Sequence, residues 1–235
     1  MPGALYLLPV GLGDGAWEAF LPARTRDIAC SLHHFVVENA KTARIELKRI
    51  SHPVPLHDLK IEQLPERITP ADLDRLLAPL AADQDMGLMS EAGCPGVADP
   101  GALLVRRAHE KGWTVRPLVG PSSLLLALMA SGLDGQHFAF HGYLPVREPE
   151  RGQRIKMLEK ESARLGQTQM FIETPYRNMT LFQAILAACR ESTRLCVATD
   201  LTRTTETVVT RPVGQWKKYA PPELERRPTV FLLLS

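Results

Sequence analysis

Short apolar runs alternate with amphipathic segments along the first half of the chain. A short continuous apolar run is typical of a buried strand, whereas apolar residues three and four positions apart predict a helix. A short helix is expected from Gly15, and Pro22 limits it to about two turns. Prolines and turn formers over 51–65 predict an extended connection. The remaining pattern predicts strands over 4–10, 34–37, 86–90 and 113–118, and helices over 40–50, from 70 onward and over 101–111.

A second series of strands and helices follows a Gly-Pro pair at 120–121. Strands that alternate with helices are typical of an α/β fold with a mostly parallel sheet. Because a new series of strands and helices begins near Val119, we predict two α/β domains, an N-terminal one over 1–118 and a C-terminal one over 119–235. In this half the pattern predicts strands over 138–142, 169–173, 195–200, 205–212 and 228–234, and helices over 122–131, 147–165 and 178–190.

Composition narrows the class of protein. The 235 residues are 45% hydrophobic and 23% charged, which excludes a disordered chain, a collagen and a small disulfide scaffold. The longest apolar run, 124–130, is far below the ~20 residues that a membrane span needs, and we expect no signal peptide. The four cysteines form no C-x-x-C pair, and Cys189 and Cys196, seven positions apart, have no histidine nearby at metal-ligand spacing. We therefore expect a cytoplasmic protein with reduced thiols, no membrane partner and no metal.

The formal net charge of +2 is too small to indicate a nucleic-acid surface by itself. Residues 118–235 nevertheless carry 15 Lys and Arg against 11 Asp and Glu. An RNA partner would therefore have to meet a local patch, for which Arg147, Arg151, Arg154 and Lys156 on one predicted helix are candidates. A solvated helix face is the alternative interpretation.

A glycine-rich turn follows the first predicted strand. Gly11, Gly13 and Ala16 fit the pattern G-x-G-x-x-[GA], and Glu38 ends the second strand where a ribose-binding acid would lie. An NAD-dependent oxidoreductase is therefore a distant alternative, although Pro22 would cut short the helix that should face the pyrophosphate. A turn near some other ligand and a purely structural turn also stay open.

Two further loops follow predicted strands. The segment SEAGCPGVADPG over 90–101 places glycines, prolines and acids at a carboxyl strand end, where open α/β sheets bind ligands. The segment over 117–124 adds a rigid Gly-Pro turn and the serines at 122 and 123. Together they predict a ligand site, and tight turns with helix caps are the alternative.

Glu173 and Arg177 follow a later strand in the segment FIETPYR. A guanidinium can hold a phosphate, and a carboxylate can accept a proton. The alternative is a salt bridge at the start of a helix.

These motifs in this order resemble the tetrapyrrole (cobalamin and precorrin) methylase superfamily, and within it the ribosomal RNA small subunit methyltransferase I branch. That branch carries S-D-A-G-T-P-x-x-x-D-P-G where this chain has 90–101, and P-L-P-G-P-S-A where it has 117–123. Its F-x-G-F-L-P is similar to 140–145, its Y-E-A-P-H-R to 172–177, and its E-L-T-K to Asp200-Leu-Thr-Arg203. The sequence departs from the branch at A-E-D-T-R, which here reads Val37-Glu-Asn-Ala-Lys41, and we expect no counterpart of the branch's C-terminal extension.

The resemblance implies two α/β domains with S-adenosylmethionine bound in the cleft between them, and a homodimer. The positions of this sequence that match the family's cofactor site are Pro9, Ser90, Ala92, Gly93, Val97, Ala98, Asp99, Ser122, Ser123, Ile172, Pro228 and Thr229.

The function expected from the resemblance is S-adenosylmethionine-dependent methyl transfer to a ribose 2′-hydroxyl of ribosomal RNA. Glu38 or Glu173 would act as the base, and Lys41 or Arg177 would hold a phosphate. The alternatives are a small-molecule methylase acting on a tetrapyrrole-like acceptor, and a non-catalytic module that binds S-adenosylmethionine.

Overall fold

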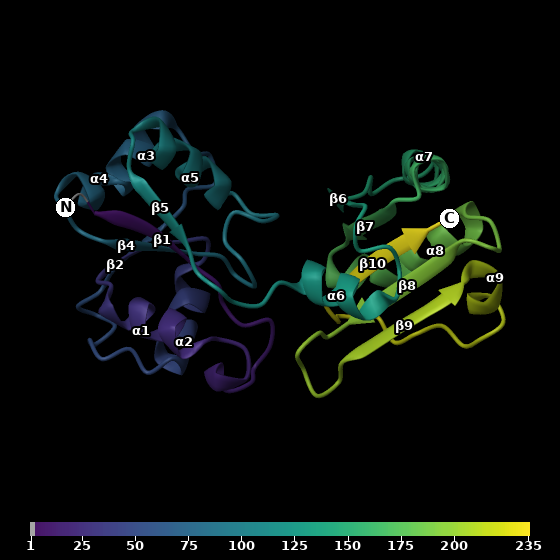
Figure 1. The fold of residues 1–235 in the computed structure, drawn as a ribbon, viewed down its shortest axis with the longest axis horizontal. Coiled ribbons are helices and arrows are strands. Elements are labelled where there is room, and N and C mark those ends of the chain that lie inside the picture. Colours follow the sequence, from purple (N-terminus) through teal and green to yellow (C-terminus); the bar gives the residue numbers. More distant parts are fainter. Residues whose placement is uncertain (1–2) are drawn as a thin grey trace. The chain divides into compact units, whose positions relative to one another are not determined.

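The structure, a computed structural model, describes residues 3–235. They form two compact units, of which the first ends at Ser122 and the second comprises Ser123–Ser235 (Figure 1). Each unit has one sheet covered by helices, which confirms the predicted α/β class with two α/β parts.

The first unit contains a parallel sheet. Within residues 3–122 the strands follow the order β3-β2-β4-β1-β5, and every neighbouring pair is parallel. A parallel sheet places all its carboxyl strand ends at one edge, so the loops after β1, β2 and β4 lie beside one another. The strands are β1 (Ala4–Leu8), β2 (His34–Val37), β3 (Lys60–Gln63), β4 (Met86–Met89) and β5 (Thr114–Pro117).

Helices cover both faces of this sheet (Figure 1). Phe35 and Val37 of β2 enter the core on one face, whereas Val36 enters the core on the other, so the strand is apolar without interruption. Thr69 begins α3 through a capping box with Asp72, which confirms the helix predicted from residue 70. On the first face lie α1 (Ala23–Ser31) and α2 (Ala40–Arg49), and on the second α3 (Pro70–Leu76), α4 (Ala78–Ala81) and α5 (Gly101–Glu110).

Two elements of this unit differ from the sequence prediction. Pro22 does not end a helix: the short 3₁₀ turn η1 (Trp17–Ala19) precedes it, and it is the N-cap residue of α1. A helix start accepts proline because the first N–H groups have no partner inside the helix. The segment over 51–65 also contains β3, an edge strand with no buried residue, so the apolar pattern did not mark it.

The second unit contains a mixed sheet, so the prediction of a mostly parallel sheet is wrong here. Its order is β6-β7-β10-β8-β9; β6 and β7 are parallel, whereas β10 is antiparallel to both its neighbours and β8 is antiparallel to β9. An apolar run predicts a buried strand but carries no information on its direction. The strands are β6 (Phe138–Tyr143), β7 (Thr168–Ile172), β8 (Arg194–Thr199), β9 (Thr207–Pro212) and β10 (Thr229–Leu234).

Helices also cover both faces of the second sheet. One face packs around Phe171 and Phe231, and the other around Met170 and Leu232. The first face holds α7 (Glu150–Leu165), α8 (Asn178–Ala188) with the preceding turn η2 (Pro175–Arg177), and α9 (Val213–Trp216); the second holds α6 (Ser123–Ser131).

None of the helices within residues 3–235 has the length and apolar character to cross a bilayer, and these residues contain no group of three or more His, Cys, Asp or Glu placed to bind a metal ion.

Candidate functional site

Three loops of the first unit meet at the carboxyl edge of its sheet. Val10, after β1, pairs with Gly93, after β4, through two backbone hydrogen bonds of 2.9 and 3.2 Å. The Oε2 atom of Glu38, after β2, accepts a hydrogen bond of 3.1 Å from the backbone N–H of Glu91. Because β4 lies between β2 and β1, its loop is held from both sides. The motifs that the sequence singles out after these three strands therefore lie together.

Ser90 and Gly93 shape the first turn of the loop after β4. The buried hydroxyl of Ser90 donates to the carbonyl oxygens of Ala92 and Gly93, both at 3.3 Å. Gly93 lies at φ +73°, where a residue with a Cβ would be strained. Ala92 is exposed. The turn therefore presents the exposed methyl group of Ala92 to a ligand, without a bulky side chain in the way.

Asp99 closes the second half of this loop. Its carboxylate accepts hydrogen bonds of 2.8 Å from the N–H of Gly96 and 2.7 Å from the N–H of Gly101. Burial raises the pKa of Asp99, and the two N–H groups oppose that shift. Val97 and Ala98 are exposed, and Ala98 is held at φ +61°. Asp99 thus fixes the loop, while the residues just before it stay accessible.

The segment that ends the first unit packs against the loops after β1 and β4. Cys94 donates through Sγ to the carbonyl oxygen of Pro121 at 3.3 Å. A Cβ on Gly120 would lie only 2.2 Å from the Cβ of Pro9, so this approach requires glycine. Pro9 and the half-buried Ser122 are thereby held at the same edge of the sheet.

Glu38 and Lys41 differ in their surroundings. Burial raises the pKa of Glu38; the hydrogen bond from the N–H of Glu91 opposes this, and the charges of Asp99 and Glu91 raise the pKa further. Lys41 is exposed in the first turn of α2, where its backbone N–H donates to the side chain of Asn39, the helix cap, at 2.9 Å. A carboxyl group whose pKa lies above its usual range is suited to take up a proton near neutral pH.

A buried ion pair beneath the glycine-rich turn was missed at the level of sequence. Glu46 is buried on α2, and its Oε1 lies 3.1 Å from Nη1 of Arg49. The same Nη1 donates to the carbonyl oxygen of Gly13 at 2.7 Å. Burial raises the pKa of Glu46, and the charge of Arg49 and the N–H of Gly11 oppose the shift. The sequence feature that could have revealed this pair is Glu46, a carboxylate on the apolar face of the predicted helix, because a buried charge needs a partner.

In the second unit, Glu173 and Arg177 form an ion pair just after β7. The Glu173 side chain is 2% exposed, and its Oε1 accepts hydrogen bonds from Nε and Nη2 of Arg177 at 3.0 and 2.7 Å. The same oxygen accepts a hydrogen bond from the N–H of Thr174 at 2.7 Å. The hydrogen bond to Glu173 raises the pKa of Arg177. Glu173 is therefore committed to orienting the guanidinium, which leaves Glu38 as the better placed of the two candidate bases.

The turn at 228–229 lies beside this ion pair because β10 runs antiparallel to β7, with Val230 opposite Ile172. The buried hydroxyl of Thr229 donates to the carbonyl oxygen of Arg227 at 3.0 Å, whereas Pro228 is exposed. Ile172, Pro228 and Thr229 are therefore neighbours within this unit. Ser123 lies apart from them along the chain, as the first residue of α6.

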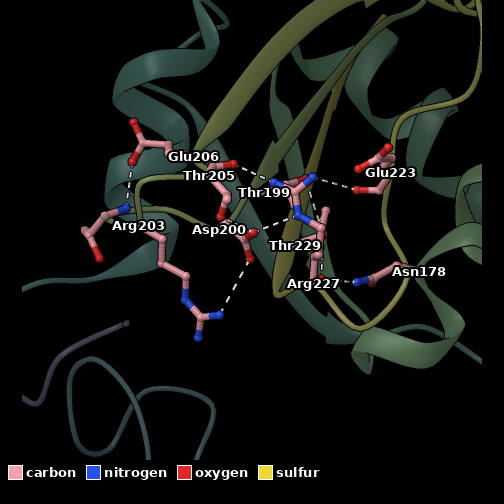
Figure 2. A network of polar contacts seen from close by, with 10 residues as sticks. Asn178, Thr199, Asp200, Arg203, Thr205, Glu206, Glu223, Arg227 and Thr229 are labelled. Carbon is pink, nitrogen blue, oxygen red and sulfur yellow. Dashed lines mark hydrogen bonds and ion pairs between the residues drawn. The ribbon is translucent and has the colours of Figure 1, made fainter. Parts of the chain in front are cut away.

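A polar network around Asp200 holds the 228–229 turn (Figure 2). Arg227 Nε and Thr205 Oγ1 both donate to Oδ2 of Asp200 at 2.7 Å. The backbone N–H of Asp200 donates to the carbonyl oxygen of Pro228 at 2.9 Å. Its other oxygen, Oδ1, lies 3.8 Å from Nη1 of Arg203; this oxygen is buried and accepts no hydrogen bond from the part of the chain that the structure describes. Asp200 therefore joins the β8–β9 loop to the turn before β10.

The network keeps Asp200 ionised despite its burial. Burial would raise its pKa, but the hydrogen bonds from Thr205 and Arg227, with the charges of Arg227 and Arg203, outweigh this and hold the pKa below its usual range. Asp200 lies at φ +52° and Arg226 at +57°, a conformation that costs roughly 1 kcal/mol or more for a residue other than glycine. Strained backbone held by a buried ion pair is typical of functional sites.

Two of the four basic residues expected to bind RNA, Arg151 and Arg154, already contact other side chains of the protein. Arg151 is buried and forms an ion pair of 2.9 Å with a glutamate three residues earlier. Arg154 contacts the ring of His141 at 3.2 Å. Arg147 and Lys156 are exposed, but Arg147 precedes α7, because the helix begins at Glu150 and not at 147 as the pattern predicts. An RNA contact from this region would therefore rest on the latter two.

No family model matches this chain. It is 30% identical over 235 residues to ribosomal RNA small subunit methyltransferase I of Escherichia coli O157:H7, which covers 99% of this chain and 77% of that protein. It is also 30% identical over 217 residues to the protein of the same name from Vibrio cholerae serotype O1, over 90% of this chain and 69% of that protein.

Two solved structures share the fold over almost the whole chain. The methyltransferase CobJ superposes with a TM-score of 0.65 at 18% identity, covering 99% of this chain and 94% of that one. The cobalt precorrin-4 methyltransferase CbiF superposes with a TM-score of 0.62 at 14% identity, covering 98% and 94%. At this identity the likeness concerns the fold.

Proposed function

The chain belongs to the ribosomal RNA small subunit methyltransferase I family, and we propose that it transfers a methyl group from S-adenosylmethionine to a ribose 2′-hydroxyl of ribosomal RNA. The single observation that carries this proposal is the meeting of Glu38 with the loops after β1 and β4 at one sheet edge, by way of the Glu91 and Val10–Gly93 contacts. The names of the relatives support ribosomal RNA as the substrate class, and the position of Glu38 supports its role as a base.

The loop after β4 fits S-adenosylmethionine in its chemistry. Gly93 and Gly96 lie at positive φ, and Ala92, Val97 and Ala98 are exposed, so the loop is accessible to the amino-acid and ribose parts of the ligand. In the second unit, the residues that would hold it are Ile172 and the 228–229 turn. When bound, the sulfonium supplies an electrophilic methyl group, and the protein has to align it with the acceptor.

Glu38 takes the proton of the ribose hydroxyl in this proposal. Its pKa lies above the usual range because it is half-buried among carboxylates, and the N–H of Glu91 fixes its orientation. Arg177 holds a phosphate of the RNA, because Glu173 fixes two of its N–H groups in one plane and leaves Nη1 for another acceptor. Lys41, exposed beside Glu38 in the sequence, supplies a second positive charge for the backbone.

The test is transfer of labelled methyl groups to unmodified transcripts of small-subunit ribosomal RNA and to small subunits assembled from them. We expect incorporation by the wild-type protein, and a loss of about 100-fold or more in kcat for Glu38→Gln with unchanged cofactor affinity, because general base catalysis contributes about that much. Glu62→Gln is a matched control, since Glu62 lies on the same sheet in an exposed ion pair with Arg75. Full activity of Glu38→Gln would remove Glu38 from the proposal.

The same assay, with tetrapyrrole precursors in place of RNA, checks the alternative acceptor. Incorporation into a tetrapyrrole but not into either RNA form would contradict the proposed substrate. We also propose that the protein works in the cytoplasm as a homodimer, which the resemblance to the family supports.

A further inference from the structure

Two exposed tyrosines lie at the carboxyl end of the β6–β7 pair. Tyr143 ends β6 opposite Ile172 of β7 and is 58% exposed, and Tyr176 lies in η2, just after β7, and is 69% exposed. The register of β6 shifts between Phe140 and Tyr143, and Gly142 inside this shift lies at φ +63°. Such a bulge redirects the side chains that follow it, and it leaves Tyr143 outside the core while the next residue, Leu144, is buried.

Arg177 lies beside Tyr176 at this end of the sheet. Its Cζ is 5.2 Å from the centre of the Tyr176 ring, and its Nε and Nη2 are held by the buried Glu173. Tyr143 pairs with Ile172, the last residue of β7, and Glu173 follows Ile172 directly, so both tyrosines lie at the strand ends next to this ion pair. A flat cation held in place beside exposed rings therefore ends these two strands.

This combination suits a nucleotide that is not paired. Bases splayed out of a helix are stacked on aromatic rings or on arginine planes, and a guanidinium also binds phosphate. An RNA duplex displays its ribose 2′-hydroxyls in the minor groove, so it is the aromatic rings, and not the reaction, that favour an unpaired nucleotide. A double helix presents its bases edge-on and could not use the faces of these rings.

We propose that Tyr143, Tyr176 and Arg177 form a subsite for one unpaired nucleotide of the RNA, with its base stacked on a tyrosine ring and its phosphate on the guanidinium. The proposal rests on the proposed RNA methyltransferase function and assigns a place for the nucleotide within the second unit. The adenine of the cofactor is a rival occupant for the same rings, so the experiment measures both ligands.

The experiment compares Tyr143→Ala, Tyr176→Ala and Tyr176→Phe with the wild-type protein. Tyr219→Ala is the matched control. Tyr219 is also 58% exposed, and its ring centre lies 4.2 Å from Cζ of Arg211. It follows α9, however, and Arg211 lies on β9, the strand at the other edge of the same sheet. Three quantities are measured: the Kd for a fluorescein-labelled single-stranded fragment of small-subunit ribosomal RNA, kcat/KM for methyl transfer to the RNA, and the Kd for S-adenosylmethionine by calorimetry.

We expect at least one of the two alanine variants to weaken RNA binding and kcat/KM by about 10-fold or more, the usual effect of losing one base-stacking ring. Tyr176→Phe and Tyr219→Ala should stay within about twofold of wild type, and cofactor affinity should not change. Unchanged RNA binding in both alanine variants would overturn the subsite, as would an equal loss in Tyr219→Ala. A loss confined to cofactor affinity would assign the rings to adenine instead.

The binding measurement separates this subsite from the reaction. If the wild-type protein binds the RNA fragment through these tyrosines but methylates no RNA, the proposed function fails and the subsite stands. If it methylates RNA and the alanine variants do so equally well, the subsite fails and the function stands. If the wild-type protein neither binds nor methylates RNA, both fail.

Discussion

Replacing Asp200 by asparagine tests whether the buried network of the second unit holds the turn at 228–229. Asp200→Asn keeps the size of the side chain and removes its charge. Arg227 then loses the carboxylate to which Nε donates at 2.7 Å, while the backbone bond from residue 200 to Pro228 is retained. Any effect therefore comes from the ion pair rather than from lost volume.

The size of the effect follows from burial. The side chains of Asp200 and Arg227 are 5% and 22% exposed, so the pair is screened far less than a surface ion pair. Removing one partner of a buried pair costs about 3–5 kcal/mol. Arg227 is partly exposed, however, and still donates to the carbonyl oxygens of Glu223 and Thr205. We therefore expect the free energy of unfolding to fall by about 2–3 kcal/mol.

The pH dependence of this loss has a definite sign. The pKa of Asp200 in the folded protein lies below its value in the unfolded chain, about 3.9. Its contribution to stability is thus complete above that value and disappears as the pH falls through the folded pKa. The difference between wild type and Asp200→Asn should be constant near neutral pH and shrink in acid.

The assay is chemical denaturation together with calorimetric titration of S-adenosylmethionine. Glu159→Gln is the matched control. Glu159 is also buried in the second unit, and it accepts hydrogen bonds from the N–H of Arg190, at 2.7 Å, and from Thr193, which precedes β8 at the other end of the strand from Asp200. We expect both variants to lose stability. We expect Asp200→Asn alone to weaken cofactor binding, by about tenfold if 1.4 kcal/mol of turn stabilisation is lost.

Two results would refute the reasoning. A loss of less than about 0.5 kcal/mol in Asp200→Asn would mean that the pair behaves as a surface ion pair. Equal cofactor affinity in Asp200→Asn and Glu159→Gln would mean that the network stabilises the unit without positioning the turn.

Three further predictions concern the first unit and the assembly. The acid limb of the pH profile of kcat/KM should lie above the usual range for glutamate because the pKa of Glu38 is raised, and Glu38→Gln should abolish this limb. The raised pKa also means that ionisation of Glu38 destabilises the folded protein above about pH 4.3, so Glu38→Gln should not lower the free energy of unfolding. Gly120→Ala should destabilise the protein by about 1–3 kcal/mol in denaturation, because its Cβ would lie 2.2 Å from Pro9, whereas Gly15→Ala, with nothing within 4 Å, should change little. Light scattering should give twice the chain mass of 26.1 kDa, and a mass of one chain at all concentrations would contradict the homodimer.

Local pattern was sufficient for most of the elements. The apolar run at 4–10, the helix start at Thr69 and the glycine-rich segment over 90–101 each act over a few residues, so a strand, a helix and a loop follow from them directly. The likeness of these motifs to one family also predicted the fold that the solved structures share.

Direction and partnership of strands were decided only in three dimensions. The apolar residues of β10 would suit a parallel strand equally well, but its place between β7 and β8 makes it antiparallel to both. Pro22 could end a helix or begin one, and the packing of α1 on the sheet selected the second. Both outcomes depend on contacts between distant segments, which local periodicity does not encode.

The same reason explains what was missed in the site. Glu46 and Arg49 lie one turn apart, yet their role depends on the carbonyl of Gly13, which the fold brings into contact with Arg49. Asp200 and Arg227 are 27 residues apart and meet only because β8 and β10 are neighbours. The sequence on its own determined which residues carry charge and which loops end strands. The tertiary structure decided which charges meet out of water, because burial and pairing belong to the packed sheet and not to any single segment.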